Sequence, residues 1–392
     1  MNRHLMPQSL FHPTQIHLKQ SALVHNYHFL KSKAGSHSEV AAVVKADAYG
    51  HGLKAVAKIL FQEGCRTFCI VSLDEAWGLR QELGRTARII KLIPSLPGEY
   101  PDVVELGLEQ VLVNREDRLS WGEFLKKKDQ VLPVHLKVDR GMGRLGYPYR
   151  EFIEDLPFFR DTTLFRVVGV MSHLPASEET PPEKGVKGTG GIYHTSAEIG
   201  RFEQVVETVR VILNATPALH IGNSGTALYY PRSCFDMVRT GLALYGADPR
   251  GGDPRKAGLE PVMEIKTHLV QVRTLDKGAT IGYGRTHHVE QPTRVGVIPV
   301  GYADGFFRSF ARGGQILVGG QYCKVLGRIS MNLTSVDLGR APAARQGDEA
   351  VLLGQQSGAE ILAAEIALWG ETIPYEVFTS FGRLIPHRVV QP

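Results

Sequence analysis

Val43-Val44-Lys45-Ala46-Asp47-Ala48-Tyr49-Gly50-His51-Gly52 is the stretch from which the fold of this chain can be worked out. The apolar run 40–44 ends abruptly in Lys45, and an amphipathic segment begins at Leu53. This pattern predicts a buried strand, a turn and a helix, with Lys45 at the C-terminal tip of the strand. Burial there would disfavour the charged form of the lysine. These residues alone favour the simpler interpretation, a lysine that extends to the rim of a sheet and keeps its charge.

Strands and helices alternate from this stretch to the middle of the chain. The predicted strands, each followed by a helix, are 40–44, 67–71, 88–93, 110–113, 133–138, 164–171 and 218–221. Such alternation predicts a parallel sheet covered by helices. Eight or so units in about 250 residues match the size of a (β/α)8 TIM barrel. A doubly wound open sheet is the alternative, although no GxGxxG follows the first strand, so its dinucleotide-binding form has no support.

The pattern changes near Gly246. Residues 247–258 are rich in Gly, Pro and charged side chains and are typical of a linker. Beyond the linker, glycine turns separate short strands predicted at 263–274, 293–300, 315–318, 324–326, 334–337 and 349–353, with one helix near 360–369. The sequence therefore predicts an α/β fold: a barrel with an N-terminal arm in residues 1–250, followed by a mostly-β domain in residues 251–392. A strand is expected in the arm at 14–18.

Composition limits the kind of protein that this chain can be. Its 392 residues, 43% hydrophobic and 22% charged, suffice for two soluble domains with sizeable cores. The net charge of +5 is small, and Asp129 directly follows the densest basic run, 126–128, so no nucleic-acid partner is expected. The four cysteines form neither a disulfide framework nor a metal-ligand spacing. From the cysteine spacing we expect no metal. Because no apolar run has the length of a signal-peptide core or a membrane span, we expect a cytoplasmic protein without a membrane partner.

Small and hydroxyl residues follow the predicted strand 218–221, which comes last among the predicted barrel strands, and a glycine ends a later stretch. Gly222-Asn223-Ser224-Gly225-Thr226 opens a helix, where free N–H groups and the helix dipole can hold a phosphate, although a simple N-cap has the same pattern. Residues 237–242 contain a second close approach at Gly241. Late strands of a barrel commonly build a phosphate site. We therefore expect Asn223, Ser224 and Gly241 to bind an anionic group.

A long polar loop, residues 174–194, contains two adjacent prolines and four glycines. This composition excludes a regular helix or strand. The loop is equally well interpreted as a mobile surface excursion and as a flap over the mouth of the barrel.

The stretch 43–52 resembles, without a gap, the pyridoxal-phosphate (PLP) lysine motif of alanine racemases, a family of fold-type III PLP enzymes. The resemblance covers nearly the whole chain and implies a barrel followed by a β-domain. It also implies that Lys45 holds PLP, since a neutral amine forms a Schiff base with an aldehyde. With the resemblance, Lys45 is interpreted as a catalytic residue and no longer as a structural one.

The segment Lys137-Val138-Asp139-Arg140-Gly141-Met142-Gly143-Arg144 is similar to the family motif LKxDxGMGR. In the family this arginine contacts the phenolic oxygen of PLP and positions the substrate, which implies both roles for Arg144. Many members carbamylate the lysine that matches Lys137, and the added negative charge can hold the arginine. Arg140 stands where a small hydroxyl residue is expected, so the local geometry can differ here.

The resemblance implies further contacts to PLP. Ser224 and Gly241 would bind its phosphate together with Tyr49 and Tyr375. His173 would link an arginine to a tyrosine by hydrogen bonds.

Arg239 would face the pyridine nitrogen of PLP. Because arginine has only donors, this contact requires an unprotonated ring nitrogen, which weakens the ring as an electron sink. A carbanion would then be reprotonated at once, which suits racemisation and discourages transamination or elimination.

Racemisation needs a base on each face of the substrate Cα. Lys45 would be one base. The second would be Tyr283, in the glycine-flanked sequence Gly282-Tyr283-Gly284, although such a tyrosine could also pack in a hairpin. In the family this tyrosine comes from the other subunit, which implies a homodimer with two shared sites. Tyr302 would line the access channel and the Met331 backbone would contact the substrate carboxylate.

The leading hypothesis is a PLP-dependent alanine racemase that supplies D-alanine for peptidoglycan. Asn332 stands where the family usually has Asp, so a racemase of broader range, acting on serine or lysine, is an alternative. A PLP decarboxylase of related fold is disfavoured because Arg239 opposes a strong electron sink. A non-catalytic PLP carrier is disfavoured because it needs neither Tyr283 nor the β-domain.

Overall fold

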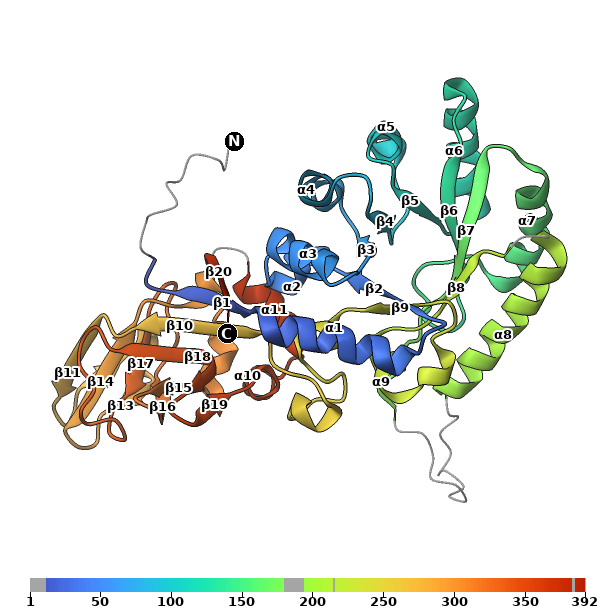
Figure 1. The fold of residues 1–392 in the computed structure, drawn as a ribbon. Coiled ribbons are helices and arrows are strands. Elements are labelled where there is room, and N and C mark those ends of the chain that lie inside the picture. The colour runs from blue at the N-terminus through green and yellow to red at the C-terminus, as the bar shows by residue number, and fades with distance from the viewer. Residues whose placement is uncertain (1–11, 180–193, 214–215, 383–384, 392) are drawn as a thin grey trace, which may run out of the picture.

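Eight parallel strands form one sheet that curls into a nearly closed barrel (Figure 1). The structure is a computed structural model that describes residues 12–179, 194–213, 216–382 and 385–391. The strands lie in the order β8-β7-β6-β5-β4-β3-β2-β9. Their bounds are β2 Glu39–Val43, β3 Thr67–Ile70, β4 Arg88–Lys91, β5 Glu109–Leu112, β6 Leu132–Lys137, β7 Phe165–Met171, β8 Ala218–His220 and β9 Met237–Thr240. The predicted barrel is therefore confirmed, and the open doubly wound sheet is excluded.

The last strand of the barrel is β9, so the prediction that 218–221 comes last was wrong. All four residues of β9 are buried, and the strand pairs in parallel with β2. Two backbone hydrogen bonds join its flank to that of β8: Asp236 N to Leu219 O at 3.0 Å and Arg239 N to Gly222 O at 3.1 Å. The strand was missed because it is short and carries an arginine, which interrupts the apolar signal.

Helices cover the outside of the barrel, as expected for its alternating pattern. They are α1 Gln20–Ala34, α3 Leu53–Gln62, α4 Leu73–Leu83, α5 Tyr100–Glu105, α6 Arg115–Lys128, α7 Tyr149–Asp161, α8 His194–Leu213 and α9 Ser224–Tyr229. Helix α4 begins with a capping box in which Ser72 and Glu75 satisfy each other's backbone N–H groups. Most of the predicted flap 174–194 lies outside the described residues.

The second half of the chain forms a β-domain. Its strands are β10 Met263–His268, β11 Gln271–Leu275, β14 Thr293–Ile298, β15 Gln315–Val318, β16 Gln321–Leu326, β17 Thr334–Asp337, β18 Glu349–Gln356, β19 Ala359–Ile361 and β20 His387–Val390, with a hairpin of β12 Thr280–Ile281 and β13 His287–His288. One strand predicted at 263–274 is in fact two, since the chain turns between β10 and β11. Helix α10 spans Ala363–Gly370, near the predicted helix, whereas α11 at Pro374–Phe381 was not predicted.

The first strand of the chain belongs to the sheet of the β-domain. Strand β1, Gln15–Lys19, pairs antiparallel with β10 and in parallel with β20. The chain therefore passes from the β-domain into the barrel and returns to it. Figure 1 shows α1 running along the junction and α11 beside α2, Lys45–Gly50.

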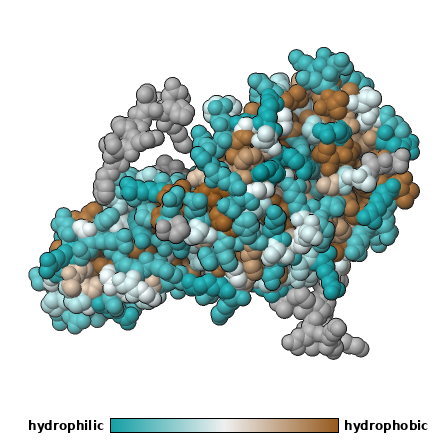
Figure 2. Space-filling view, viewed as in Figure 1, coloured by the Kyte–Doolittle hydropathy of each residue, from teal (hydrophilic) through white to brown (hydrophobic). Residues whose placement is uncertain are grey.

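Polar side chains cover most of the face drawn in Figure 2, and the apolar areas on it gather mainly over the barrel. Of the described helices, none is both long and apolar enough to cross a membrane.

Candidate active site

Cationic side chains converge at the C-terminal ends of the barrel strands, where barrel proteins place their sites. Lys45 lies two residues beyond the end of β2 and is half-buried. Lys137 ends β6 and Arg239 lies within β9, and both are buried, with 5% and 4% of their surface exposed. His173 follows the end of β7. The structure thus brings together four residues that the sequence predicted to share a site.

A left-handed helical turn follows Lys45. Residues 46–49 all have φ between 53° and 55°, which costs roughly 1–2 kcal/mol for each residue with a Cβ. Two side chains hold the turn: Glu75 Oε1 accepts from Ala46 N at 2.5 Å, and Asp47 Oδ1 accepts from Leu53 N at 2.7 Å. The sequence predicted a turn here but not its hand. Strain held in place by specific contacts is typical of a functional position.

The β-domain supports this turn from the other side. A Cβ on Gly50 would lie 2.3 Å from the carbonyl oxygen of Phe378 in α11, so only glycine fits between the two backbones. The ring of His387 donates from Nε2 to Gly50 O at 2.8 Å. The lysine that begins α2 is therefore held by both domains.

We predict that Gly50→Ala lowers the free energy of unfolding by about 2 kcal/mol, because it adds a clash to a backbone conformation with φ of +77°. Gly64→Ala is the matched control. Gly64 has φ of +93° but no atom within 4 Å of an added Cβ, so this variant carries backbone strain alone. Thermal unfolding midpoints measure the difference, and equal shifts in the two variants would show that the contact with α11 contributes nothing.

Positive charge at the barrel mouth weakens the protonated forms of both lysines. Burial and the charge of Arg144 lower the pKa of Lys45, and Glu75 only partly opposes them. Burial, Arg239 and Arg144 lower the pKa of Lys137 to about 8. The site therefore favours neutral amines and attracts anions.

Arg239 makes hydrogen bonds with both of its terminal nitrogens. Nη1 donates to His220 Nδ1 at 2.9 Å and to His220 O at 3.0 Å. Nη2 donates to Ser172 O at 2.8 Å and to His173 Nδ1 at 3.2 Å. Burial lowers the pKa of Arg239 only to about 10, so the side chain keeps its charge at neutral pH. Its Nε makes no hydrogen bond to any residue that the structure describes.

Hydroxyl side chains lie close to Gly241, two residues after this arginine. Ser224 Oγ accepts from the backbone N–H groups of Gly241 at 3.0 Å and Ala243 at 3.2 Å. A Cβ on Gly241 would lie 2.6 Å from the phenolic oxygen of Tyr49, whose ring is 5.8 Å from that of Tyr375. The hydroxyl groups of Ser224 and Tyr49 beside this glycine suit a phosphate group, and the N–H groups of Gly241 and Ala243 are engaged by Ser224 in this structure.

Two buried hydroxyl groups near the mouth have no hydrogen-bond partner within the described ranges. They belong to Ser172, directly after β7, and to Thr240, between Arg239 and Gly241. Such orphaned groups are uncommon and indicate a ligand that would satisfy them. A phosphorylated aldehyde such as PLP fits this chemistry, because the mouth combines a lysine of lowered pKa, buried donors and hydroxyl groups beside a glycine.

Some predicted residues have other local tasks in the structure. Asn223 is the N-cap of α9, where its side chain accepts from Thr226 N at 3.2 Å. The side chain of Arg144 is exposed, and its backbone N–H donates to Asp139 Oδ2 at 3.1 Å. Arg140 stacks its guanidinium over the ring of Tyr149 at 4.5 Å, away from the predicted contacts of Arg144.

Three of the four predicted site residues of the β-domain lie on exposed segments, whereas Tyr375 lies in α11. Tyr283 is 72% exposed in the hairpin of β12 and β13, which Figure 1 draws at the end of the molecule away from β2. Tyr302 and Met331 are neighbours, because Ala303 N donates to Met331 O at 2.9 Å. Both are exposed. One chain therefore does not bring Tyr283 to Lys45.

Asn332 lies beside this pair and contacts a carboxylate. Its Nδ2 donates to Oδ1 and Oδ2 of Asp304 at 3.3 and 3.2 Å. An aspartate at this position would place a second carboxylate against Asp304. Asn332, where the family usually has aspartate, therefore avoids repulsion between two carboxylates and donates to Asp304 instead.

Several polar residues inside the barrel were not predicted. His220 contacts Arg239, and Tyr245 donates to Val43 O at 2.9 Å and stacks on His51 at a ring distance of 4.4 Å. The available signal was a polar side chain inside an otherwise apolar strand, as for His220 in β8. Only the parallel register shows that such residues point toward one another.

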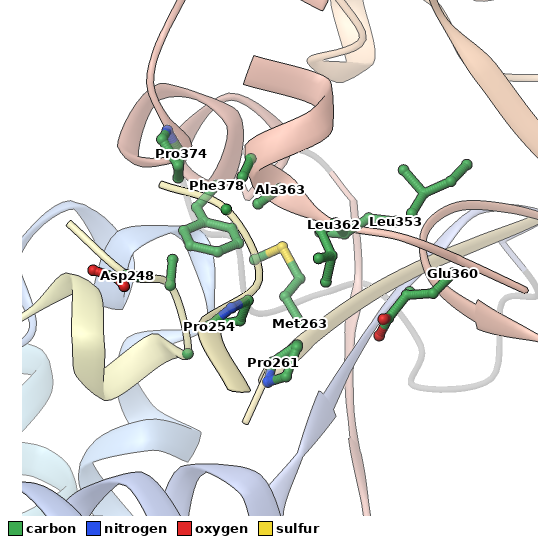
Figure 3. A pocket seen from close by; sticks show the side chains of 16 residues that line it. Asp248, Pro254, Pro261, Met263, Leu353, Glu360, Leu362, Ala363, Pro374 and Phe378 are labelled. Atoms are coloured by element: carbon green, nitrogen blue, oxygen red, sulfur yellow. The ribbon is translucent and has the colours of Figure 1, made fainter. Parts of the chain in front are cut away.

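Figure 3 shows a separate apolar pocket between the barrel and the β-domain. Met263 and Phe378 point into it, and Asp248 and Glu360 lie at its edge. Both carboxylates already have partners, since Tyr229 donates to Asp248 and Arg255 pairs with Glu360. Among the described residues, no group of His, Cys, Asp and Glu is arranged to hold a metal ion. The barrel mouth is therefore the better candidate site.

Comparison with known proteins agrees with this geometry. The chain is 35% identical over 377 residues to the alanine racemase of Thermodesulfovibrio yellowstonii, covering 95% of this chain and 96% of that protein. It is 31% identical over 381 residues to that of Halothermothrix orenii, covering 97% and 98%. The solved alanine racemase of Bartonella henselae, with covalently bound pyridoxal phosphate, superposes with a TM-score of 0.85 at 27% identity and covers 97% of this chain and 100% of that one.

A lysine at the mouth of a (β/α)8 barrel together with an appended β-domain is typical of the fold-type III class of PLP-dependent enzymes. The sequence models of the alanine racemase N-terminal and C-terminal domains match residues 18–249 and 262–389. The chain belongs to the alanine racemase family.

Proposed function

We propose that this protein is a PLP-dependent racemase that interconverts L-alanine and D-alanine and supplies D-alanine for peptidoglycan. The observation that carries the proposal is that Lys45 and Arg239 both lie at the same mouth of the barrel. Bound PLP supplies an aldehyde for the substrate amine and a conjugated ring that accepts electron density from Cα.

Lys45 is proposed to hold PLP and to move a proton on one face of Cα. Its lowered pKa supports this role, because a base must be neutral before it can accept a proton. The left-handed turn and the packing of α11 keep the amine in place during the transfer. The proposed phosphate contacts are Tyr49, Asn223, Ser224, Gly241 and Tyr375.

Arg239 is proposed to direct the proton back to Cα. Its terminal nitrogens are engaged by His220, Ser172 and His173, which leaves Nε–H for the pyridine nitrogen. An arginine can only donate there, so the ring nitrogen stays unprotonated and the ring is a weak electron sink. Side reactions that need a long-lived carbanion are then disfavoured. This argument also opposes the decarboxylase alternative.

The second base is proposed to be Tyr283 of a partner subunit. In support, Tyr283 is exposed, and Tyr302, Met331 and Leu333 place further exposed apolar surface on nearby loops. A Cβ on Gly282 would lie 3.0 Å from the backbone nitrogen of Arg328. The hairpin therefore lies against the loop that precedes Met331. A homodimer with two shared sites would bring this surface to the barrel mouth of the other chain. Arg144 and the Met331 backbone would bind the substrate carboxylate, and Tyr302 would line its access.

Mixing two inactive variants tests the shared site. Chains carrying Lys45→Ala and chains carrying Tyr283→Ala are unfolded together, refolded and assayed. If the sites are shared, each mixed dimer has one intact site, and about a quarter of all sites are active under random pairing. If Tyr283 acts within its own chain, no mixed site is intact and activity stays absent. Each variant refolded alone is the control.

A racemisation assay on alanine, serine and lysine with PLP present tests the substrate. We expect alanine to react fastest. A preference for lysine or serine would instead establish a racemase of broader substrate range. This alternative is kept because Asn332, which contacts Asp304, replaces the aspartate that is usual in the family.

We also propose a cytoplasmic location. In support, all four cysteines are buried and unpaired, as is usual for proteins of a reducing compartment.

Lys137 is proposed to be carbamylated. Carbon dioxide reacts with a neutral amine, and a pKa of about 8 leaves an appreciable neutral fraction of Lys137 at pH 7. The product is an anion among Arg144, Arg239 and Lys45, where it relieves the repulsion that lowers this pKa. We predict that ¹³C-bicarbonate gives one slowly exchanging carbamate signal by NMR, and that Lys137→Met removes it. Retention of the signal in that variant would exclude Lys137.

A further inference from the structure

A line of hydrogen-bonded side chains crosses the barrel interior behind Arg239. Nη1 of Arg239 is 2.9 Å from Nδ1 of His220, and Nε2 of His220 is 2.9 Å from Nδ1 of His135. Nε2 of His135 is 2.7 Å from Oε2 of Glu109. Arg88 then binds Glu109 with Nε and Nη2 at 2.9 and 3.0 Å. The five residues come from the strands β9, β8, β6, β5 and β4.

The donor at one end and the acceptor at the other show where each proton along this line lies. Arginine can only donate, so Nδ1 of His220 must be an acceptor and its proton must lie on Nε2. Nδ1 of His135 must then accept that proton, which places the proton of His135 on Nε2. Glu109 Oε2 must accept in turn, and because Arg88 donates to both carboxylate oxygens, Glu109 is ionised. No other arrangement satisfies all three contacts.

The electrostatic environment agrees with this assignment. Burial and the charge of Arg239 hold the pKa of His220 well below its usual value, and burial also lowers the pKa of His135, so both rings are neutral. Burial alone would raise the pKa of Glu109, but His135 and Arg88 outweigh it and bring the pKa to about 2. Two neutral rings thus connect a buried cation to a half-buried anion.

The barrel makes room for this line at a specific place. A Cβ on Gly169 of β7 would lie 2.0 Å from Nδ1 of His135, so only glycine leaves space for the ring. The register between β6 and β7 shifts between Val134 and His135. The rings of His135 and His220 meet at 90° with their centroids 5.0 Å apart. The contact therefore depends on a local departure from regular strand pairing.

We propose that Glu109 and His135 are positioning residues that act through His220 on Arg239. They hold His220 in the Nε2–H tautomer, so that Nδ1 always accepts from Nη1 and the Nε–H of Arg239 points to the barrel mouth. This inference rests on the proposed function only in its last link, from Arg239 to PLP. The tautomers themselves belong to the protein whatever its substrate.

The first test measures these tautomers in the holoenzyme by ¹⁵N NMR of labelled histidine. The expected result is one pair of imidazoles joined by a scalar coupling between ring nitrogens across the N–H···N bond, both neutral with the proton on Nε2 from pH 6 to 8. A pair with a proton on Nδ1, or a pair that becomes doubly protonated in this range, would overturn the proposal. This measurement needs neither a variant nor activity.

The second test compares Glu109→Gln with Glu39→Gln. Glu39 also binds Arg88, at 3.2 Å, but does not contact His135, so it is the matched control. In Glu109→Gln the amide nitrogen cannot accept, and it must face a donor of either Arg88 or His135. We expect mixed tautomers at both histidines, a changed absorption spectrum of bound PLP and a kcat reduced about tenfold with little change in KM. In Glu39→Gln we expect wild-type tautomers and spectrum.

Equal effects of Glu109→Gln and Glu39→Gln on the tautomers, the PLP spectrum and kcat would show that the hydrogen-bonded side chains have only a structural role. That result would overturn the proposal. Unchanged tautomers in Glu109→Gln would do the same. An inactive wild-type protein with the expected tautomers would instead contradict the proposed function and leave the positioning of Arg239 intact. The two claims therefore fail by different measurements.

Discussion

Lys45→Ala is expected to lower the rate of racemisation by at least about 10³-fold, because the change removes both the anchor for PLP and one of the two proposed bases. The variant should also lose covalent PLP. The half-buried position of Lys45 and the charge of Arg144 favour a neutral amine, and no side chain at the same strand end can replace it: Ala46 and Asp47 lie in the left-handed turn and offer no amine.

Borohydride reduction followed by peptide mass analysis measures the attachment. In the wild type, Lys45 should carry the reduced cofactor. Lys54→Ala, an exposed lysine of α3, is the control and should leave attachment and activity unchanged. Reduced cofactor on another lysine of the Lys45→Ala variant, or a normal rate without attachment, would show that Lys45 is not the anchor.

Tyr283→Phe is expected to slow the removal of the α-proton from one enantiomer by about 10²–10⁴-fold and from the other far less. The phenol is proposed to act on one face of Cα only, while Lys45 acts on the opposite face. Phenylalanine keeps the ring and its packing and removes the oxygen that carries the proton. Because Tyr283 is exposed in the single chain, the change should leave the fold intact.

The measurement is exchange of the α-proton for solvent deuterium, followed separately from L-alanine and from D-alanine. His288→Ala, in the other strand of the same hairpin, controls for a change of the hairpin surface. Equal slowing of both enantiomers in Tyr283→Phe would argue against two bases on opposite faces. It would leave the assignment of Lys45 unaffected.

Much of the fold could be predicted because it depends on local patterns. The helix predicted after the strand 67–71 is present as α4, Leu73–Leu83, since its cap and apolar period lie within the same residues. The β-domain was predicted less well. The turn between β10 and β11 contains no Gly or Pro, and α11 is only eight residues long, so neither leaves a strong signal.

The candidate site was predicted unevenly for the same reason. Lys45 and the segment around Ser224 stand directly after apolar strands, so the sequence pointed to them. His135 lies inside β6, Glu109 begins β5 and His220 ends β8, and a single polar residue in or beside an apolar strand gives no signal of a site. Their common role depends on the parallel register of neighbouring strands, which no local pattern encodes.

The sequence by itself determined the alternation that makes the barrel, the change to short strands after Gly246 and the position of Lys45 at a strand end. Each of these features depends on residues that are close together in the sequence. Only the tertiary structure decided the left-handed turn after Lys45, which needs Glu75 and α11, and the strand β9 that carries Arg239 into the barrel. These features exist because backbones and charges distant in sequence pack against each other, and that packing outweighs the local preferences of the residues involved.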